Sequence, residues 1–452
     1  MKRKILDELL QWKNRNDRKP LILRGVRQCG KTWALKEFGR TCFENVAYFN
    51  FDFDQNLASV FESTKDPKRL IPQLSLLSGV PIEPQKTLIV FDEIQCCGKA
   101  LNSLKYFCED APEYAVASAG SLLGVSLSKD GFPVGKVQFL DAYPMDFEEF
   151  LTASGAENFA YYMQTIDSLE NIPLAFAAPL EEKLKQYFVS GGMPGVVKNF
   201  VRNYDSIQAE YGLDELNDSY ERDFARHADR GDFPKISLIW KSVPSQLARE
   251  NKKFLYSAAK PGARAREYEN ALMWLVNAGL AYKVARIKKP GIPLLAYEDL
   301  SAFKIYMADV GLLRRLSGMT PQTVILGDAL YTEFHGAFAE NYVLQVLRKQ
   351  YGKNIFYWTD ENSRYEVDFI IQHENLIIPV EVKSGKNIVS TSMKNYASRF
   401  DDITKLRVRF SMKNLALDEN VLNIPLYLAD QAKRLIGLAA EKLDMKSEVA
   451  SP

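Results

Sequence analysis

The sequence predicts an α/β protein with a parallel sheet at its N-terminus, a helical and winged-helix-like middle, and a small α/β region at its C-terminus. Three observations favour this order. Short apolar runs alternate with helix-like segments in the first third, which is the pattern of a parallel sheet with helical crossovers. Helical periodicity dominates residues 180–277, and strand-like alternation returns at 355–383. At roughly 150 residues per domain, a chain of 452 residues suits about three domains.

Composition and charge narrow the class of protein. With 46% hydrophobic and 25% charged residues, the chain can bury several cores and keep an ordinary soluble surface. Its 58 basic and 57 acidic residues give a net charge of +1, so any binding to nucleic acid must be local. The five cysteines lack the paired spacing of a zinc site, and three histidines are too few for a multi-histidine metal cage. No stretch approaches the roughly 18 uninterrupted apolar residues of a spanning helix, so we expect a cytoplasmic protein without a membrane partner.

A phosphate-binding loop is indicated near the N-terminus. The apolar run Leu21–Leu23 leads into the octet GVRQCGKT at 25–32, and a helix-like segment follows. In a strand–GxxxxGK[ST]–helix arrangement, backbone N–H groups surround phosphate oxygens, the lysine reaches the β- and γ-phosphates, and the threonine can ligate magnesium. The candidate nucleotide-binding residues here are Gly25, Gln28, Cys29, Gly30, Lys31, Thr32 and Trp33.

A second motif completes this interpretation. The continuous apolar run Thr87–Phe91 is typical of a strand buried in a parallel sheet, and it ends in Asp92 and Glu93. This is a Walker B pattern, in which Asp92 holds magnesium together with Thr32, and Glu93 orients or deprotonates the attacking water. The sequence therefore predicts a P-loop NTPase sheet with ATP and Mg²⁺ as cofactors, and Lys31 and Glu93 as catalytic residues.

Two further runs, 46–52 and 114–121, read as neighbouring strands of the same sheet. Ser121 would stand at the carboxyl end of its strand, where open α/β sheets bind ligands. It is either a contact to the γ-phosphate or an ordinary turn serine.

These motifs resemble the bacterial and archaeal AAA-type ATPases related to the STAND group of signalling NTPases. In that family a P-loop domain precedes a C-terminal region of unknown function with nuclease-like residues. The resemblance is carried by 25–32, by LIVFDEIQ at 88–95, by the Ser121-Leu122-Leu123 turn, and by YPMDFEEF at 143–150. The chain departs from the family at Ala119, where threonine is usual, and at Lys136, where arginine is usual. Lysine offers a point charge and not a planar fork.

The middle of the chain divides into a connector and a winged-helix-like segment. We place the end of the ATPase domain, 1–155, where Ser154-Gly155 interrupts the helical pattern. In the connector, 156–215, an amphipathic helix at 180–188 stops at the Gly-Gly-x-Pro sequence 191–194, which resembles a family signature and is interpreted as a helix stop. Helices at 236–250 and 267–277, a strand at 280–287 and a hairpin partner near 305–309 fit a winged helix within 216–320.

Charged residues of this middle part have two open interpretations. Arg222 is either a nucleotide-responsive arginine or part of a solvated helix face. An oligomer in which Lys136 or Arg222 completes a neighbouring site is also left open. A local basic group either contacts DNA phosphates or is simply solvated. Its members are Lys252, Lys253, Lys260, Arg264, Arg266, Lys288 and Lys289.

The last third carries the spacing of a metal-dependent nuclease. Glu340 lies in a helix-like segment, and strands at 365–371 and 376–383 place Glu366 with Asp368, and Glu381 with Lys383, on one face each. Carboxylates of this kind bind magnesium, which activates a water and polarises a phosphodiester. We expect Glu340, Asp368 and Glu381 as metal ligands and Lys383 as a catalytic residue.

This order matches the PD-(D/E)xK signature, and the segment resembles the C-terminal region of the family named above. It predicts a nuclease-like domain over 321–440 and a polar tail over 441–452. The chain as a whole is then an ATPase of the AAA/STAND kind that acts on DNA through its middle and C-terminal regions. The alternative is an ATP-dependent regulatory switch whose nuclease-like fold is inactive.

Overall fold

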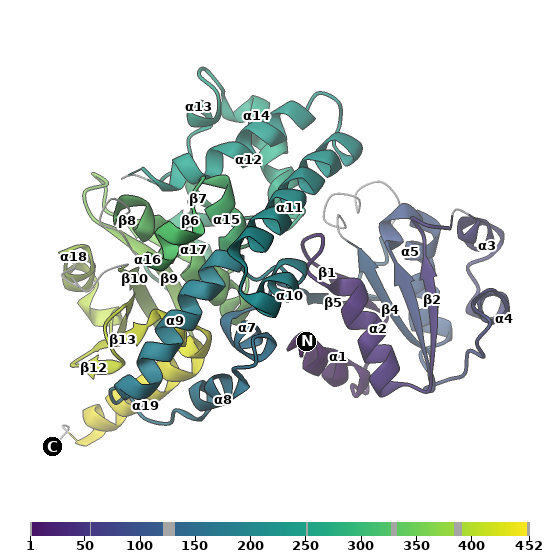
Figure 1. The fold of residues 1–452 in the computed structure, drawn as a ribbon, viewed down its shortest axis with the longest axis horizontal. Coiled ribbons are helices and arrows are strands. Elements are labelled where there is room, and N and C mark those ends of the chain that lie inside the picture. Colours follow the sequence, from purple (N-terminus) through teal and green to yellow (C-terminus); the bar gives the residue numbers. More distant parts are fainter. Residues whose placement is uncertain are drawn as a thin grey trace. The chain divides into compact units, whose positions relative to one another are not determined.

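The computed structural model describes residues 2–54, 56–120, 132–249, 252–326, 332–383 and 391–449. The chain divides into two compact units (Figure 1). Unit 1 comprises Met1–Pro144 and Asn277–Leu280, and unit 2 comprises Met145–Val276 and Ala281–Pro452. No helix in the described ranges is long and apolar enough to cross a membrane.

Unit 1 contains, in its described part, a five-stranded parallel sheet in the order β2-β3-β4-β1-β5. Its strands are β1 Leu21–Arg24, β2 Asn45–Asn50, β3 Thr87–Asp92, β4 Ala115–Gly120 and β5 Gln138–Asp141. Its helices are α1 Ile5–Lys13, α2 Lys31–Cys42, α3 Leu57–Ser63, α4 Pro67–Ser78, α5 Gly98–Asp110 and the 3₁₀ turn η1 Ile94–Cys96. The expected α/β fold with a parallel N-terminal sheet is confirmed.

The apolar strands of unit 1 lie where the sequence places them. All six residues of β3 and of β4 are buried, as continuous apolar or small-residue runs require in a sheet covered on both faces. The edge strand β5 pairs with β1 and is not among the strands expected from the sequence. Its four residues are only half-buried, so they carry no apolar run that would reveal a strand.

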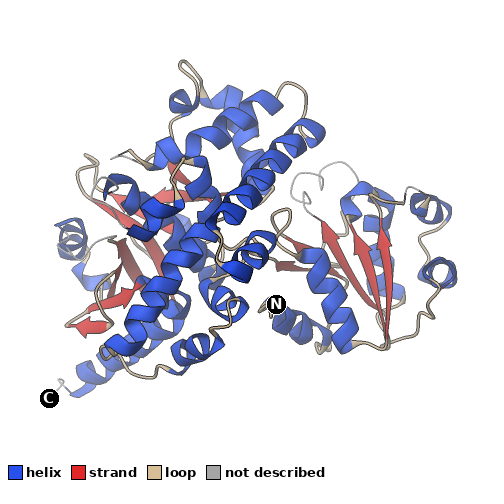
Figure 2. Cartoon of the chain, viewed as in Figure 1, coloured by secondary structure: helices blue, strands red, loops and turns tan. Residues whose placement is uncertain are grey.

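Unit 2 combines a layer of helices with a mixed sheet (Figure 2). The helices before its sheet are α7 Phe147–Ala153, α8 Glu157–Thr165, α9 Leu174–Ser190, α10 Pro194–Asn203, α11 Ser206–His227, α12 Phe233–Leu247, α13 Tyr256–Ala259 and α14 Ala265–Asn277. Those interspersed with its strands are η2 Leu294–Tyr297, α15 Val310–Leu316, α16 Pro321–Leu326, α17 Thr332–Tyr351, α18 Thr391–Arg399, η4 Asp401–Ile403, η5 Leu426–Gln431 and α19 Ala432–Val449.

The described part of unit 2 has one eight-stranded sheet in the order β12-β13-β11-β10-β9-β8-β6-β7. The strands are β6 Ala281–Ile287, β7 Glu298–Met307, β8 Phe356–Thr359, β9 Glu366–His373, β10 Leu376–Val382, β11 Arg407–Ser411, β12 Ala416–Asp418 and β13 Val421–Pro425. β6 and β7 form the expected antiparallel hairpin, and β6 also pairs with β8. The hairpin therefore continues the C-terminal sheet, and the boundary expected at residue 320 falls inside one compact unit.

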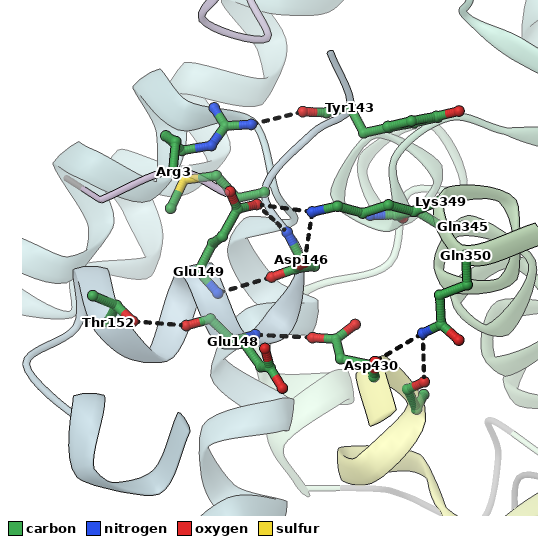
Figure 3. A network of polar contacts seen from close by, with 12 residues as sticks. Arg3, Tyr143, Asp146, Glu148, Glu149, Thr152, Gln345, Lys349, Gln350 and Asp430 are labelled. Atoms are coloured by element: carbon green, nitrogen blue, oxygen red, sulfur yellow. Dashed lines mark hydrogen bonds and ion pairs between the residues drawn. The ribbon is translucent and has the colours of Figure 1, made fainter. Parts of the chain in front are cut away.

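The boundary expected at residue 155 also falls inside unit 2. Helix α7 begins with a capping box, in which the Asp146 carboxylate accepts from the Glu149 N–H and the Glu149 carboxylate accepts from the Asp146 N–H. Figure 3 shows that Lys349 of α17 reaches both carboxylates, at 2.6 Å from Asp146 and 3.4 Å from Glu149. These buried contacts attach α7 to unit 2, so the break lies before Met145.

The Gly-Gly turn after α9 is a close-packed junction within unit 2. A Cβ on Gly192 would lie 2.1 Å from the carbonyl oxygen of Met145, and one on Gly191 would lie 2.3 Å from Oδ1 of Asp309. The Gly192 N–H donates to Oδ2 of the buried Asp309 at 2.7 Å. The helix α9 itself starts at Leu174, earlier than expected, because it accommodates Pro179 in its second turn.

Candidate functional site

The loop at 25–32 adopts three backbone conformations that side chains rarely allow. Gly25 has a φ of +151°, Gln28 of +65° and Gly30 of +92°. A Cβ on Gly25 would lie 2.1 Å from the carbonyl oxygen of Ala142, so only glycine fits there. Gln28 is not glycine, and such a conformation costs of order 1–3 kcal/mol, a strain often found at ligand sites. The loop therefore curls before α2 in the way a phosphate cradle requires.

Lys31 lies inside this curl. Its side chain is 6% exposed, and its Nζ donates to the carbonyl oxygens of Gly25 and Val26 at 2.9 Å each. The ammonium group is therefore held within the loop, where the N–H groups that begin α2 also point.

Arg3 fixes the back of the loop. Arg3 is 4% exposed, and its guanidinium donates to the carbonyl oxygen of Cys29 at 3.0 Å. It also donates to the carbonyl oxygen of Tyr143 at 2.8 Å (Figure 3). The Cys29 thiol is buried and lies 3.5 Å from the carbonyl oxygen of Ala142. Sequence reasoning did not find Arg3, because one basic residue among Lys2, Arg3 and Lys4 carries no signal of its own.

Asp92 forms the centre of the polar contacts at the end of β3. Its Oδ2 accepts from the Thr32 hydroxyl at 2.8 Å and from the Tyr48 hydroxyl at 2.6 Å, and its Oδ1 accepts from the Glu93 N–H at 3.1 Å. Burial and the hydrogen bond to Asp92 raise the pKa of Tyr48 to about 12, so Tyr48 is a neutral donor. The Thr32 hydroxyl and the Asp92 carboxylate are hard oxygen donors brought together, and this donor set fits magnesium.

Glu93 stands in an unusual conformation beside Asp92. Its φ of +50° and ψ of +42° are left-handed, which is uncommon for a residue with a side chain. Gln95 donates through Nε2 to Oε2 of Glu93 at 2.5 Å, and the Gln95 Oε1 is buried without a partner in the described part of the chain. The side-chain amide of Gln95 thus holds the Glu93 carboxylate next to the buried Asp92.

The structure places the other residues expected at this site in different surroundings. Trp33 is in the first turn of α2 and is 40% exposed. Ser121 lies outside the described residues. Lys136 pairs with Glu109 at 2.8 Å on the surface, and Arg222 is an exposed residue of α11 in unit 2. Tyr48 is a site residue that the sequence does not predict, and it comes from β2, the strand next to β3. The only sequence feature that points to it is its place in the half-apolar run before Asn50.

In unit 2 the expected carboxylates meet lysines. Glu340 on α17 is buried, forms an ion pair with Lys252 and accepts from the Tyr306 hydroxyl at 3.4 Å. Lys304 is fully buried and pairs with Glu366. Lys252, which we expected on an exposed basic surface, is instead largely covered because its ammonium faces Glu340.

Asp368 and Glu381 complete this carboxylate–lysine cluster. Oδ2 of Asp368 accepts from the Val382 N–H at 2.8 Å, and Glu381 pairs through Oε1 with Lys383 at 2.7 Å. Burial, followed by the negative charge of Glu340, raises the pKa of Asp368. Oε2 of Glu381 is buried without a partner, yet among the described residues no three His, Cys, Asp or Glu side chains are arranged to hold a metal ion.

Comparison with known families divides the chain in three. Residues 17–151 match a family described as an AAA domain. Residues 181–323 and 335–428 match two families described as domains of unknown function, DUF8612 and DUF4143. No curated protein matches the chain.

Three distant matches among solved structures each cover most of the matched protein, with low sequence identity. The Walker-type ATPase PABY2304 of Pyrococcus abyssi is 15% identical, with a TM-score of 0.43, over 70% of this chain and 95% of that one. The Aeropyrum pernix ORC1 protein in complex with DNA is 12% identical, with a TM-score of 0.28, over 70% and 90%. The Thermotoga maritima RuvB Holliday junction branch migration motor is 15% identical, with a TM-score of 0.28, over 64% and 90%.

The family match covers the loop at 25–32 and the pair Asp92 and Glu93. Residues 17–151 of this chain therefore match an AAA domain that includes both P-loop motifs.

Proposed function

We propose that this protein binds ATP with magnesium in unit 1, hydrolyses it, and couples the nucleotide state to a nucleic-acid-directed unit 2. The observation that carries the proposal is the hydrogen bond of 2.8 Å between the Thr32 hydroxyl and the Asp92 carboxylate. It joins the end of the phosphate loop to the end of the apolar strand β3, which is how the two halves of a P-loop site meet.

Each residue of the loop has a role in this proposal. The N–H groups of Gln28, Cys29 and Gly30 surround the phosphates, Gly25 permits the curl, and Lys31 leaves its carbonyl partners to contact the β- and γ-phosphates. Trp33 lies in the first turn of the helix whose N-terminus faces the phosphates, and Ser121 is proposed as a contact to the γ-phosphate.

Magnesium would be held by Thr32 and Asp92, and it would neutralise negative charge on the phosphates. Glu93 accepts a proton from the attacking water once Gln95 releases its carboxylate. Because Asp92 and Thr32 already contact each other, orienting them for magnesium costs little free energy.

ATP binding tests the first half of this proposal. Titration calorimetry with Mg-ATP should give saturable binding for the wild type and at least a tenfold weaker Kd for Lys31→Ala, about 1.4 kcal/mol or more. Lys65→Ala is the matched control, because Lys65 is an exposed lysine of the same unit. Equal affinity in Lys31→Ala and the control would contradict the site.

For unit 2 we propose a PD-(D/E)xK nuclease-like domain preceded by a winged-helix-like segment. The proximity of Glu340 and Glu381 to Asp368, whose pKa both carboxylates raise, supports it, and Oε2 of Glu381 is buried without a partner among the described residues. Lys383 would position the attacking water. Exposed cationic side chains of the middle segment would contact DNA phosphates. The cationic residues are Lys260, Arg264, Arg266, Lys288 and Lys289.

The second candidate is an ATP-dependent switch with an inactive nuclease-like fold. One observation favours it: Lys252, Lys304 and Lys383 each form an ion pair with a carboxylate of the cluster. These lysines neutralise charge that would otherwise attract a metal ion.

Two assays separate the candidates. Plasmid and single-stranded DNA are incubated with wild type and Asp368→Ala in magnesium or manganese, and products formed by the wild type alone support the nuclease. ATPase activity is then measured with and without DNA. Stimulation by DNA supports a processing enzyme, whereas indifference to DNA and no cleavage support the switch.

A further inference from the structure

Strand β11 places two arginines on one face of the sheet in unit 2, beside Glu381. Val408 and Phe410 are fully buried on the opposite face, so Arg407 and Arg409 share the other one. In the parallel pairing of β10 with β11, Arg409 lies directly opposite Glu381. Arg409 is therefore next to Glu381 of the carboxylate–lysine cluster, and Arg407 lies two residues before it on the same face.

Both arginines are oriented by amides. Nη1 of Arg409 donates to Oδ1 of Asn423 at 3.1 Å, and Nη2 of Arg407 donates to Oδ1 of Asn420. Within the described ranges neither forms an ion pair with a carboxylate. Asp418, on β12 beyond the adjoining strand β13, accepts from Asn423 at 3.1 Å and lies 3.6 Å from Lys413.

This arrangement leaves two positive charges close together, with Glu419 as the nearby negative charge that acts on Arg407. Burial and the charge of Arg409 lower the pKa of Arg407. The Nε of each arginine is buried without an acceptor in the described part of the chain, while each residue as a whole is only half-buried. An asparagine fixes the plane of a guanidinium without neutralising it, so each fork is oriented and still cationic.

The ligand that matches two oriented guanidinium forks is a pair of phosphates. Arginine binds phosphate oxygens bidentately, and partial desolvation strengthens such contacts. Glu381 lies on the neighbouring strand β10, and Lys383 follows its last residue and donates its N–H to the carbonyl oxygen of Phe410 at 2.8 Å. A polymer lying along β11 would present successive phosphates to the arginines while passing the cluster.

We propose that Arg407 and Arg409 bind the phosphodiester backbone of DNA beside Glu381 and Lys383. This inference rests on the proposed nucleic-acid role of unit 2, but it requires neither cleavage nor a metal ion. Arg407 and Arg409 act as binding residues that hold the strand next to the cluster.

The test measures DNA binding by the full chain in EDTA. Fluorescence anisotropy reports the binding at salt concentrations from about 50 to about 200 mM. The variant Arg407→Gln/Arg409→Gln should bind at least tenfold more weakly at low salt. The slope of log Kd against log salt should fall by about 1 to 2, the value for two lost phosphate contacts. Arg407→Lys/Arg409→Lys should keep the slope and lose only part of the affinity.

Lys65→Gln/Lys442→Gln is the matched control, because it removes two positive charges from exposed positions elsewhere in the chain. Thermal unfolding of each variant shows whether the fold is retained, and the lysine variant covers the case in which glutamine unfolds unit 2. Affinity and slope equal to those of the control would overturn the assignment to these arginines and leave the proposed function standing. No DNA binding by the wild type would refute both.

A further arm distinguishes the polymer from free phosphate. Inorganic phosphate added at matched ionic strength should leave the DNA complex intact. Displacement of DNA by inorganic phosphate would overturn the proposal, because it would identify the ligand as the free anion.

Discussion

The hydroxyl of Tyr48 lies 2.6 Å from Oδ2 of Asp92 and donates a hydrogen bond to it. The same oxygen accepts from Thr32 at 2.8 Å, so Asp92 is held from the phosphate loop on one side and from β2 on the other. Lys36 lies over the Tyr48 ring, 3.8 Å from its centroid, and keeps the ring in place. Tyr48 is therefore a positioning residue for the acid that we expect to hold magnesium.

Tyr48→Phe should weaken the dependence of the ATPase domain on magnesium more than its stability. A residue that hydrogen-bonds to a metal ligand is typically worth about 10–100-fold in metal affinity. We expect the magnesium concentration for half-maximal ATP binding to rise by about tenfold, while the free energy of unfolding falls by only about 1 kcal/mol. Because the pKa of Tyr48 is raised to about 12, this difference between the two proteins should persist up to about pH 10. An unchanged magnesium requirement would remove Tyr48 from the site.

Replacing Arg3 should weaken the hydrogen bonds that hold the phosphate loop in place. Arg3→Met keeps the aliphatic stem but leaves the carbonyl oxygens of Cys29 and Tyr143 without this donor. The expected loss is about 1–3 kcal/mol in the free energy of unfolding of unit 1, together with weaker ATP binding. Lys2→Met is the control, since Lys2 is exposed. Denaturant unfolding and ATP titration measure both effects, and identical behaviour of the two variants would contradict the role of Arg3.

A pair of glycine substitutions tests the junction after α9. In Gly192→Ala the new Cβ would lie 2.1 Å from the Met145 carbonyl oxygen, so the turn must shift and unit 2 should lose more than about 2 kcal/mol. Gly195, in the first turn of α10, has open space around it, and Gly195→Ala should be neutral or stabilise by up to about 1 kcal/mol. Thermal unfolding midpoints that move equally in both variants would rule out the close approach as the reason for Gly192.

Asp309 should make the stability of unit 2 depend on pH. Burial raises the pKa of Asp309 from 3.8 to about 6. As the pH falls, the folded chain therefore takes up this proton before the unfolded chain does. The contribution of Asp309 to the free energy of unfolding thus increases below about pH 6 and is lost as the pH rises through that value. The difference between 3.8 and about 6 corresponds to roughly 3 kcal/mol.

Asp309→Asn removes this titration and leaves one acceptor for the N–H groups of Gly192 and Leu312. The stability of the wild type relative to Asp309→Asn should therefore increase by roughly 3 kcal/mol between about pH 7 and about pH 4. Urea unfolding at several pH values measures it. A constant difference between the two proteins across that range would show that Asp309 is ionised in both states.

The local part of the nucleotide site can be predicted from the sequence. The loop at 25–32 and the apolar run before Asp92 are contiguous, so their residue types alone indicate a strand, a turn and a helix. Tyr48 and Arg3 approach from distant positions, and only the pairing of β2 with β3 and the packing of the N-terminal segment bring them to Asp92 and Cys29. Such contacts have no signature within the sequence of either residue.

Unit 2 was harder to anticipate because its sheet is assembled from separated segments. The hairpin of β6 and β7 was expected as part of a separate winged helix, yet β6 pairs with β8, about 70 residues further on. The same sheet holds Lys304 of β7 near Glu366 of β9, and Lys252, from a loop, pairs with Glu340 of α17. Alternation along one strand identified which carboxylates share a face, but not which lysines neutralise them.

Phosphate release from ATP by Glu93→Gln tests the central claim most directly. The wild type should release phosphate steadily in the presence of magnesium. Glu93→Gln should bind ATP with nearly the same affinity but release phosphate at least 100-fold more slowly, because an amide cannot accept the proton of the attacking water. Lys31→Ala, measured alongside, should lose binding as well. A phosphate release rate for Glu93→Gln equal to that of the wild type would contradict the account.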